Sequence, residues 1–251
     1  MRNVRLRAAS GALPDPLHHQ RTLMQIGIFG TGMVGQTLAA ALVTRGHQVM
    51  IGTRDPAATL ARETGTPMDP TPFRAWLASN PGVKLGTFTE AARFGEALIN
   101  ATSGGGALPA LEAAGADALG EKVMLDVANP LDFSRGMPPT LSVCNTDSLG
   151  EQLQRAFPRL RVVKTLNTTN VRVMVDPAAV AGGNHTMFVC GNDAAAKADA
   201  TRWLGEWFGW RDVIDLGDIT TARGTEMLLP IWVRLWGALG TPMFNFKIVR
   251  A

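Results

Sequence analysis

Short apolar runs alternate along the chain with segments of helical pattern. Runs such as QIGIF and QVMIG have little polar alternation, which is typical of strands buried on both faces of a parallel sheet. The runs that predict strands cover residues 25–29, 48–52, 83–87, 96–101, 122–127 and 160–165. Helices are predicted between them, over residues 33–45, 56–64, 89–94, 107–118 and 147–157. This order predicts an α/β fold with a doubly wound parallel sheet and helices on both faces.

The last third of the chain has a different pattern. Residues 185–191 and 211–217 predict two more strands around a helix over 193–208. A final helical region spans residues 219–240. Pro230 is expected to kink it or to begin a new helix, because proline lacks the N–H that a helix interior needs.

Three parts of the chain are expected to differ in role. Residues 1–23 hold four arginines and one aspartate, and we interpret them as a disordered or mis-assigned N-terminal extension. Residues 24–165 are expected to form the larger domain, and residues 166–251 a small C-terminal domain for substrate binding or dimerisation. All of the formal net charge of +3 lies in the extension. The body therefore has no excess charge that would attract nucleic acid.

Composition narrows the protein class further. No apolar stretch reaches the roughly 18 residues that a membrane-spanning helix needs. The two cysteines, Cys144 and Cys190, cannot form a disulfide framework and favour a reducing, cytoplasmic location. The four histidines show no metal-ligand spacing with cysteines or acids, so no metal site is expected.

A glycine-rich turn follows the first predicted strand and leads into an Ala- and Leu-rich helix. The turn consists of Gly30, Thr31, Gly32, Met33, Val34 and Gly35. In such a turn the first glycine permits the tight bend, the second lets the backbone approach a pyrophosphate, and the third lets the helix pack closely. The helix N-terminus offers N–H groups to the phosphates. The turn and its context predict a Rossmann-type dinucleotide-binding domain over residues 24–165.

The residues after the second predicted strand indicate which dinucleotide is bound. NAD-specific sites place Asp or Glu there, where it bonds the ribose 2′-hydroxyl. This chain has Thr53 and Arg54, a hydroxyl and a guanidinium that suit a 2′-phosphate. Asp55 is explained by helix initiation, with Pro56 at the first helical position. NADP is therefore favoured over NAD.

Further strand ends are expected to line the site, because ligands of this fold bind at the carboxyl ends of the strands. The cofactor candidates there are Thr102, Ser103, Gly104, Ala128, Asn129 and Pro130. The substrate candidates are Asn167, Thr168 and Met243. Gly, Asn, Pro and Thr also favour turns in their own right, which is the alternative interpretation of each loop.

The succession of these motifs resembles the NADPH-dependent coenzyme F420 reductases and related bacterial NADP oxidoreductases. The matching stretches are GIFGTGMVGQTLAAALVTRGHQVMIGTRDP, DVANPLDF, VVKTLNTTN, FVCGNDAAAK and FNFKI. The resemblance implies an NADP-binding domain, a small C-terminal domain that helps form the hydride-transfer cleft, and a soluble homodimer. It implies that Thr31, Thr53 and Arg54 hold the 2′-phosphate, and that the deazaflavin coenzyme F420 is the co-substrate.

The hydride acceptor is left open at this point. The loop over residues 102–106 departs from the Pro-containing apolar loop expected in deazaflavin reductases. The alternatives are an NADPH-dependent reductase of flavin, quinone or a small carbonyl, and a non-catalytic NADP(H) sensor. A carbonyl substrate would need a proton donor, for which His185 is the candidate histidine.

No catalytic acid or base is assigned. The chain contains no tyrosine, which excludes a Tyr-x-x-x-Lys dehydrogenase mechanism, and hydride transfer between two rings depends mainly on their alignment. Lys164 is interpreted as a strand-end charge and His185 as a polar residue at a strand start. Core or dimer packing is expected for Trp203, Trp207, Trp210, Trp232 and Trp236.

Overall fold

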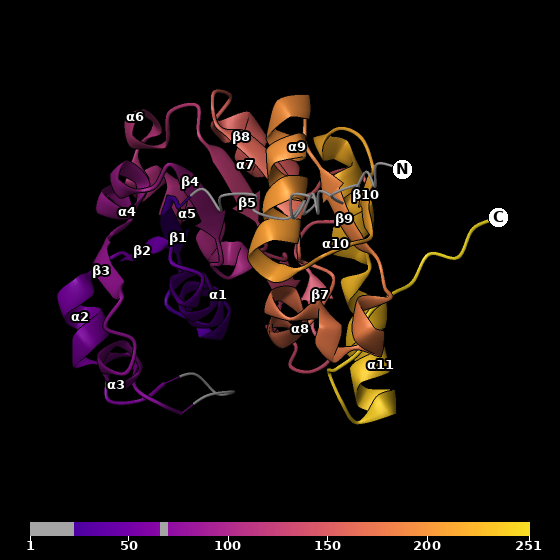
Figure 1. The fold of residues 1–251 in the computed structure, drawn as a ribbon, viewed down its shortest axis with the longest axis horizontal. Coiled ribbons are helices and arrows are strands. Elements are labelled where there is room, and N and C mark those ends of the chain that lie inside the picture. Colours follow the sequence, from indigo (N-terminus) through magenta and orange to yellow (C-terminus); the bar gives the residue numbers. More distant parts are fainter. Residues whose placement is uncertain (1–22, 66–69) are drawn as a thin grey trace, which may run out of the picture.

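The computed structural model describes residues 23–65 and 70–251, so the predicted N-terminal extension lies outside the described residues except for Leu23. Eight strands form one sheet in the order β10-β9-β8-β5-β4-β1-β2-β3 (Figure 1). They are β1 (Gln25–Phe29), β2 (Gln48–Thr53), β3 (Val83–Thr87), β4 (Ala97–Asn100), β5 (Val123–Asp126), β8 (Arg161–Thr165), β9 (Met187–Cys190) and β10 (Val213–Asp215). Every neighbouring pair is parallel except β8 and β9, which run antiparallel. The predicted Rossmann-type α/β fold is confirmed.

Helices cover both faces of the sheet. One face packs against α1 (Met33–Thr44), α2 (Pro56–Ala61), α3 (Phe73–Ala78), α8 (Val171–Val175) and α9 (Ala194–Trp203), which continues as a π-helical turn over Leu204–Phe208. The other face packs against α4 (Phe88–Phe94), α5 (Gly104–Ala114), α6 (Ala116–Leu119), α7 (Leu149–Ala156) and α10 (Ala222–Met227). Figure 1 looks onto the first face, with α9 in the foreground. Each face therefore has its own apolar core, as expected for a sheet with two covered faces.

The C-terminal third extends the same sheet. β9 and β10 pair next to β8, and they are the strands predicted over residues 185–191 and 211–217. The division of the chain at residue 165 stays a prediction. The last helix, α11 (Leu229–Leu239), begins one residue before Pro230, so the expected new helix is confirmed. A hairpin of β6 (Leu131–Asp132) and β7 (Thr140–Leu141) was not predicted.

The order of the strands places the site. From β1 the chain adds β2 and β3 on one side, and then returns to place β4 on the other side of β1. In this fold a ligand binds in the crevice at the carboxyl ends of the strands where the order reverses. None of the helices in the described ranges combines the length and the apolar character that crossing a bilayer requires.

Candidate cofactor and substrate site

The turn between β1 and α1 has the geometry that its glycines predict. Gly30 has a φ of 116°, and a Cβ there would lie 2.6 Å from the carbonyl oxygen of Ala101. A Cβ on Gly35 would lie 2.1 Å from the carbonyl oxygen of Gly30, so α1 can pack this closely only without a side chain. At Gly32, the N-cap of α1, a Cβ would meet no atom within 4 Å. The backbone at the start of α1 is therefore open on the side where a Gly32 side chain would stand, which fits the close approach of a pyrophosphate.

At the end of β2, Thr53 is buried and Arg54 is exposed. The hydroxyl of Thr53 lies 2.9 Å from the hydroxyl of Thr59 on α2. The carboxylate of Asp55 accepts a 3.0 Å hydrogen bond from the N–H of Ala58 and caps α2. The nearest acid is thus engaged at a helix start, while the Arg54 side chain extends into solvent.

The loop predicted over residues 102–106 is shorter in the structure. Gly104, Gly105 and Gly106 form the first turn of α5, and Ser103 is its N-cap. The expected loop is wrong for these glycines, because the first turn of a helix needs few internal hydrogen bonds and accepts glycine. A Cβ on Gly104 would lie 2.3 Å from the carbonyl oxygen of Asn129. The start of α5 therefore touches the loop after β5, and glycine is required at the contact.

Two hydrogen bonds between asparagines join the loop after β5 to the loop after β8. Asn129 donates through Nδ2 to the carbonyl oxygen of Asn167 at 2.8 Å, and Asn167 donates through Nδ2 to Oδ1 of Asn129 at 3.0 Å. Leu166, just before, has a left-handed φ of 60°, a conformation that costs a non-glycine residue energy and is concentrated at functional sites. The structure thus brings one cofactor candidate and one substrate candidate into direct contact.

The other two substrate candidates are Thr168, on the loop after β8, and Met243, on the C-terminal segment. The hydroxyl of Thr168 is buried and has no hydrogen-bond partner among the described residues. The neighbouring Thr169 donates to the carbonyl oxygen of Phe244 at 3.5 Å, and Met243 is half-buried against the core. The C-terminal segment therefore reaches the loop after β8.

A row of buried polar side chains lies beneath these loops. Asn100, Asp126 and Lys164 occupy matched positions on β4, β5 and β8, and each is 0% exposed. Asn100 donates to Asp126 at 2.8 Å. Asn100 also accepts from the backbone N–H and the hydroxyl of Thr102, and Asp126 accepts from the N–H of Ala128 at 3.2 Å. The row fixes the starts of two loops that contain cofactor candidates.

Lys164 is the centre of this cluster. Its Nζ lies 2.7 Å from carboxylate oxygens of both Asp126 and Glu226, and it donates to the carbonyl oxygen of Ala128 at 2.7 Å. Glu226, on α10, also accepts from the N–H groups of Leu149 and Gly150 at the start of α7. Lys164 is the last but one residue of β8, which agrees with its interpretation as a strand-end charge, and the partner carboxylates allow this charge to be buried.

Sequence reasoning missed this cluster because Glu226 lies 62 residues from Lys164 in the chain. A signal was present in the sequence, because each of three predicted strands carries a polar residue where its apolar run ends. Burial by itself lowers the pKa of Lys164, but the charges of Asp126 and Glu226 more than offset this, so the pKa is raised above its ordinary value. Lys164 is therefore a fixed positive charge and not a proton donor at neutral pH.

His185 is engaged at both ring nitrogens. Its Nε2 lies 2.9 Å from the carbonyl oxygen of Pro177, and its Nδ1 lies 2.8 Å from Nδ2 of Asn245. The ring is 2% exposed and packs edge-on against Trp210 at 5.0 Å. These contacts agree with the interpretation of His185 as a structural residue at a strand start.

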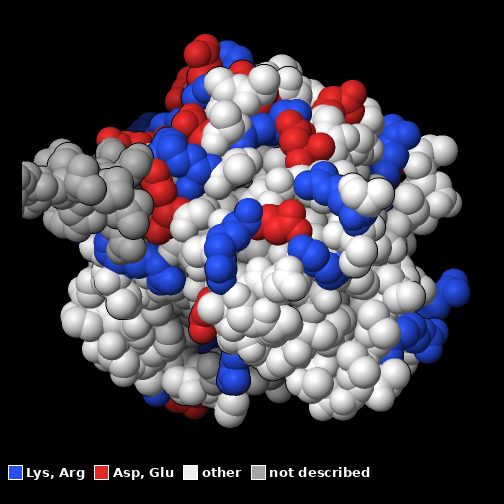
Figure 2. All heavy atoms as spheres, turned by 45° about the vertical axis from the view of Figure 1, so that its right-hand side comes forward, with Lys and Arg blue, Asp and Glu red and all other residues white. Residues whose placement is uncertain are grey.

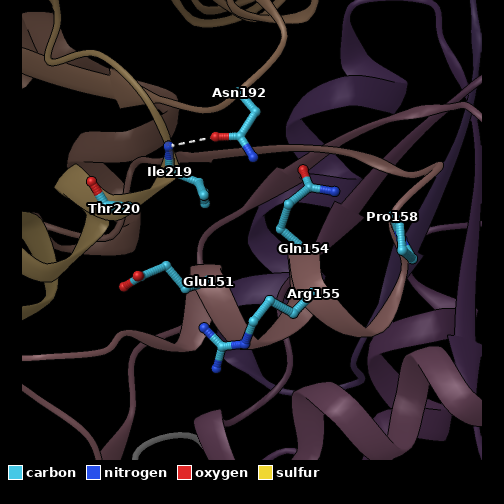
Figure 3. Close-up of a pocket in the computed structure, with 7 residues that line it drawn as sticks. All are labelled: Glu151, Gln154, Arg155, Pro158, Asn192, Ile219 and Thr220. Atoms are coloured by element: carbon cyan, nitrogen blue, oxygen red, sulfur yellow. Dashed lines mark hydrogen bonds between the residues drawn. The ribbon is translucent and has the colours of Figure 1, made fainter.

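A hollow of about 360 Å³ lies between α7 and the segments that precede β8 and follow β9. In Figure 3, Gln154 of α7 lies across from Asn192, whose Oδ1 accepts from the N–H of Ile219 at 3.1 Å, and Glu151 and Arg155 of the same helix extend away from Asn192. Glu151 is paired with Arg223, and Arg155 with Asp147. This hollow lies beside the amino end of β8, away from the loops described above, and its charged groups already have partners.

The open glycine turn, the strand-order reversal and the converging loops define a Rossmann-type oxidoreductase. Residues 25–130 match the family described as NADP oxidoreductase, coenzyme F420-dependent. A protein from Arthrobacter sp. FB24, provisionally assigned as an F420-dependent NADP reductase, is 59% identical, and the alignment covers 90% of this chain and 100% of that one with a TM-score of 0.86. The chain belongs to the coenzyme F420-dependent NADP oxidoreductase family, and it is an NADP-dependent oxidoreductase.

More distant proteins share the fold or part of the sequence. Rat metalloreductase STEAP3 is 28% identical over 218 residues, which are 83% of this chain and 38% of that protein. The chain thus spans about two fifths of the length of this curated relative. A reductive aminase from Aspergillus terreus, solved with NADPH, is 16% identical over 87% of this chain and 63% of that one, with a TM-score of 0.57. At that identity the likeness shows the fold alone.

Proposed function

We propose that the chain transfers a hydride between NADP(H) and the flat ring of the deazaflavin coenzyme F420. Its membership of the family and the 59% identity to a protein provisionally assigned as an F420-dependent NADP reductase support this acceptor. Flavin, quinone and small carbonyls are the alternative acceptors.

The proposed cofactor site follows the strand ends. The start of α1 receives the pyrophosphate at residues 30–35, where Gly32 leaves the backbone open. Thr31, Thr53 and Arg54 hold the 2′-phosphate, since no free carboxylate stands at the end of β2 to repel it. The start of α5 and the loop over residues 128–130 contact the nicotinamide half. Asn167, Thr168 and Met243 border the acceptor.

One observation carries the choice of a ring acceptor. The loops over residues 30–35, 102–106, 128–130 and 166–170 contain no Asp, Glu, His, Lys, Cys or Tyr. Lys164 beneath them stays charged, and both nitrogens of His185 are occupied. A carbonyl reductase needs a side chain that gives a proton to the new hydroxyl, whereas hydride transfer between two rings needs them held in contact.

The chain's own residues would do three things. The helix starts and Arg54 bind the charged groups of the dinucleotide, the buried row fixes the loops that orient its ring, and the joined loops after β5 and β8 border the acceptor. The nicotinamide, when bound, supplies the hydride. A proton that the acceptor ring takes up would come from solvent at its exposed edge.

We also propose that the enzyme is a homodimer joined through α11. This helix has one charged residue, Arg234, and Leu229 is its one buried residue. Ile231 is 52% exposed and Leu239 is 55% exposed. The lower part of the face in Figure 2, where α11 lies in Figure 1, shows few charged side chains. An exposed apolar helix of this kind favours association, and Ile231→Glu should then lower the mass measured by sedimentation equilibrium to that of one chain.

The function is tested by an anaerobic assay that mixes NADPH with oxidised F420 and follows the visible absorption of the deazaflavin, with NADH in parallel. Bleaching with NADPH and little with NADH is expected. Arg54→Ala should weaken NADPH binding by about 1–3 kcal/mol, the range for a hydrogen bond to a charged group, and leave NADH binding nearly unchanged. No bleaching by an enzyme that binds NADPH would reject F420 as the acceptor.

A further inference from the structure

A chain of hydrogen bonds runs from the end of α2 to the end of β2. Arg62 donates through Nη2 to the hydroxyl of Thr59 at 2.9 Å, and that hydroxyl lies 2.9 Å from the hydroxyl of Thr53. Thr59 is 1% exposed and Thr53 is 7% exposed, whereas Arg62 is exposed. An exposed cation is therefore connected through the buried hydroxyl of Thr59 to the hydroxyl of Thr53, the residue that ends β2.

The donor at one end favours one direction along this chain. A guanidinium can only donate, so the Thr59 oxygen accepts from Arg62. Either hydroxyl could donate in the bond between Thr59 and Thr53, and the direction in which Thr59 donates gives its buried proton an acceptor. With its oxygen accepting from Thr59, the Thr53 hydroxyl keeps its own proton for a third group. Consecutive bonds of this kind polarise one another and strengthen the last donor.

We propose that Arg62 determines the preference for NADPH over NADH by presenting the Thr53 hydroxyl as a donor to the 2′-phosphate. The inference rests on the proposed function, which places the 2′-phosphate at the end of β2. Arg54 contacts the phosphate directly, whereas Arg62 is a positioning residue that acts through Thr59 and Thr53. The carboxylate nearest in sequence, Asp55, caps α2 and is held by the N–H of Ala58.

A purely structural role of Arg62 would have a different signature. Arg62 follows the last turn of α2 as its C-cap, and loss of a cap contact would loosen the whole end of β2. NADPH and NADH share every group there except the 2′-phosphate, so a structural loss would weaken both cofactors together. The ratio of the two affinities therefore separates a positioning role from a structural one.

The test measures dissociation constants for NADPH and NADH by calorimetry in variants of the full-length chain. Thr59→Val removes the middle hydroxyl with little change of shape, and Arg62→Met removes the charge and keeps an apolar stem. Arg62→Lys keeps a donor and the charge. Arg74→Met is the matched control, because Arg74 is an exposed arginine on the neighbouring helix α3.

Thr59→Val and Arg62→Met should each weaken NADPH binding about tenfold, which corresponds to about 1.4 kcal/mol, with NADH changed less than about twofold. The double variant should bind NADPH with about the same affinity as the single variant that binds it less tightly, because both changes break one connected path. Arg62→Lys should recover part of the loss, and Arg74→Met should bind both cofactors as the parent does.

Equal losses for NADPH and NADH would overturn the proposal, as would an Arg62→Met variant no different from the control. Additive losses in the double variant would also overturn it, since Arg62 would then act by its charge alone. Arg54→Ala in the same assay tests the position of the 2′-phosphate site separately from the role of Arg62. If Arg54→Ala leaves the NADPH preference intact, the proposed phosphate site is wrong. If it abolishes the preference while Thr59→Val and Arg62→Met do not, only the role of Arg62 is wrong.

Discussion

Replacing Lys164 by methionine should be among the most destabilising single changes in this protein. Methionine has similar length and no charge, so the change removes the ammonium and leaves Asp126 and Glu226 buried at 0% and 1% exposure of their side chains. Removing one partner of a buried ion pair typically costs about 3–5 kcal/mol. Asp126 keeps the N–H donors of Asn100 and Ala128. Glu226 keeps the two N–H donors at the start of α7. We therefore expect the free energy of unfolding to fall by about 3 kcal/mol, the lower end of that range.

The assay is urea unfolding followed by tryptophan fluorescence. Lys247→Met is the control, because Lys247 pairs with Asp212 at the surface with its side chain 39% exposed, and such pairs contribute about 0–1 kcal/mol. Since natural domains are stable by about 5–15 kcal/mol, the predicted loss for Lys164→Met is a large fraction of the total. A loss below that of the surface control would refute the electrostatic reasoning.

Glu226→Gln gives a second measurement on the same cluster. The parent cluster holds two carboxylates and one ammonium, so it carries an excess negative charge that the start of α7 stabilises through its dipole. Glu226→Gln combined with Lys164→Met leaves one buried carboxylate instead of two. The double variant should lose less stability than the sum of the two single losses. Strictly additive losses would show that the two side chains do not interact.

Three further outcomes are expected. Gly35→Ala should weaken binding of both NADPH and NADH on the order of tenfold by calorimetry, because the new Cβ would lie 2.1 Å from a loop carbonyl oxygen and push α1 away; unchanged affinity would contradict the close packing. Burial raises the pKa of the Cys190 thiol to about 11, so iodoacetamide should alkylate exposed Cys144 in the native protein and both thiols only after unfolding, as mass spectrometry would show. The bidentate bond from Arg155 lowers the pKa of Asp147, so the stabilisation is complete above the ordinary carboxyl pKa and is lost as the pH falls towards the depressed value. Asp147→Asn should cost about 0.2–1 kcal/mol at neutral pH, and that cost should shrink below pH 3.8; a cost independent of pH would exclude the ion pair as its source.

The local pattern was sufficient for the strands and for the cofactor turn. Strand β1 and its glycines were predictable because apolar periodicity and the conformational freedom of Gly30 are properties of neighbouring residues. The first turn of α5 was missed because three consecutive glycines have weak helix propensity. Packing against the Asn129 loop holds that turn in place, and contacts of this kind overrule propensity.

The candidate site was predictable as a set of strand ends, and less so as a set of contacts. The pairing of Asn129 with Asn167 follows from which strands are neighbours, and this was not known from the sequence. The burial of Lys164 depends on Glu226, and the relay from Arg62 depends on how α2 packs on β2. The polar residues that close the apolar runs are a signal for the buried row, but which distant side chains they meet depends on the packing of the whole fold.

The strand order also describes how the sheet can grow while the chain is being made. After β1, the strands β2 and β3 are added outward on one side, and from β4 onward each of the strands β5, β8, β9 and β10 joins the edge left by the one before. The chain returns across the sheet once, between β3 and β4, and that return creates the crevice. Domains begin to fold from their N-terminal side during synthesis. The dinucleotide half-site over residues 25–130 can therefore form on the ribosome while α11 is still unsynthesised, so the cofactor has an opportunity to bind before the C-terminal segment is made.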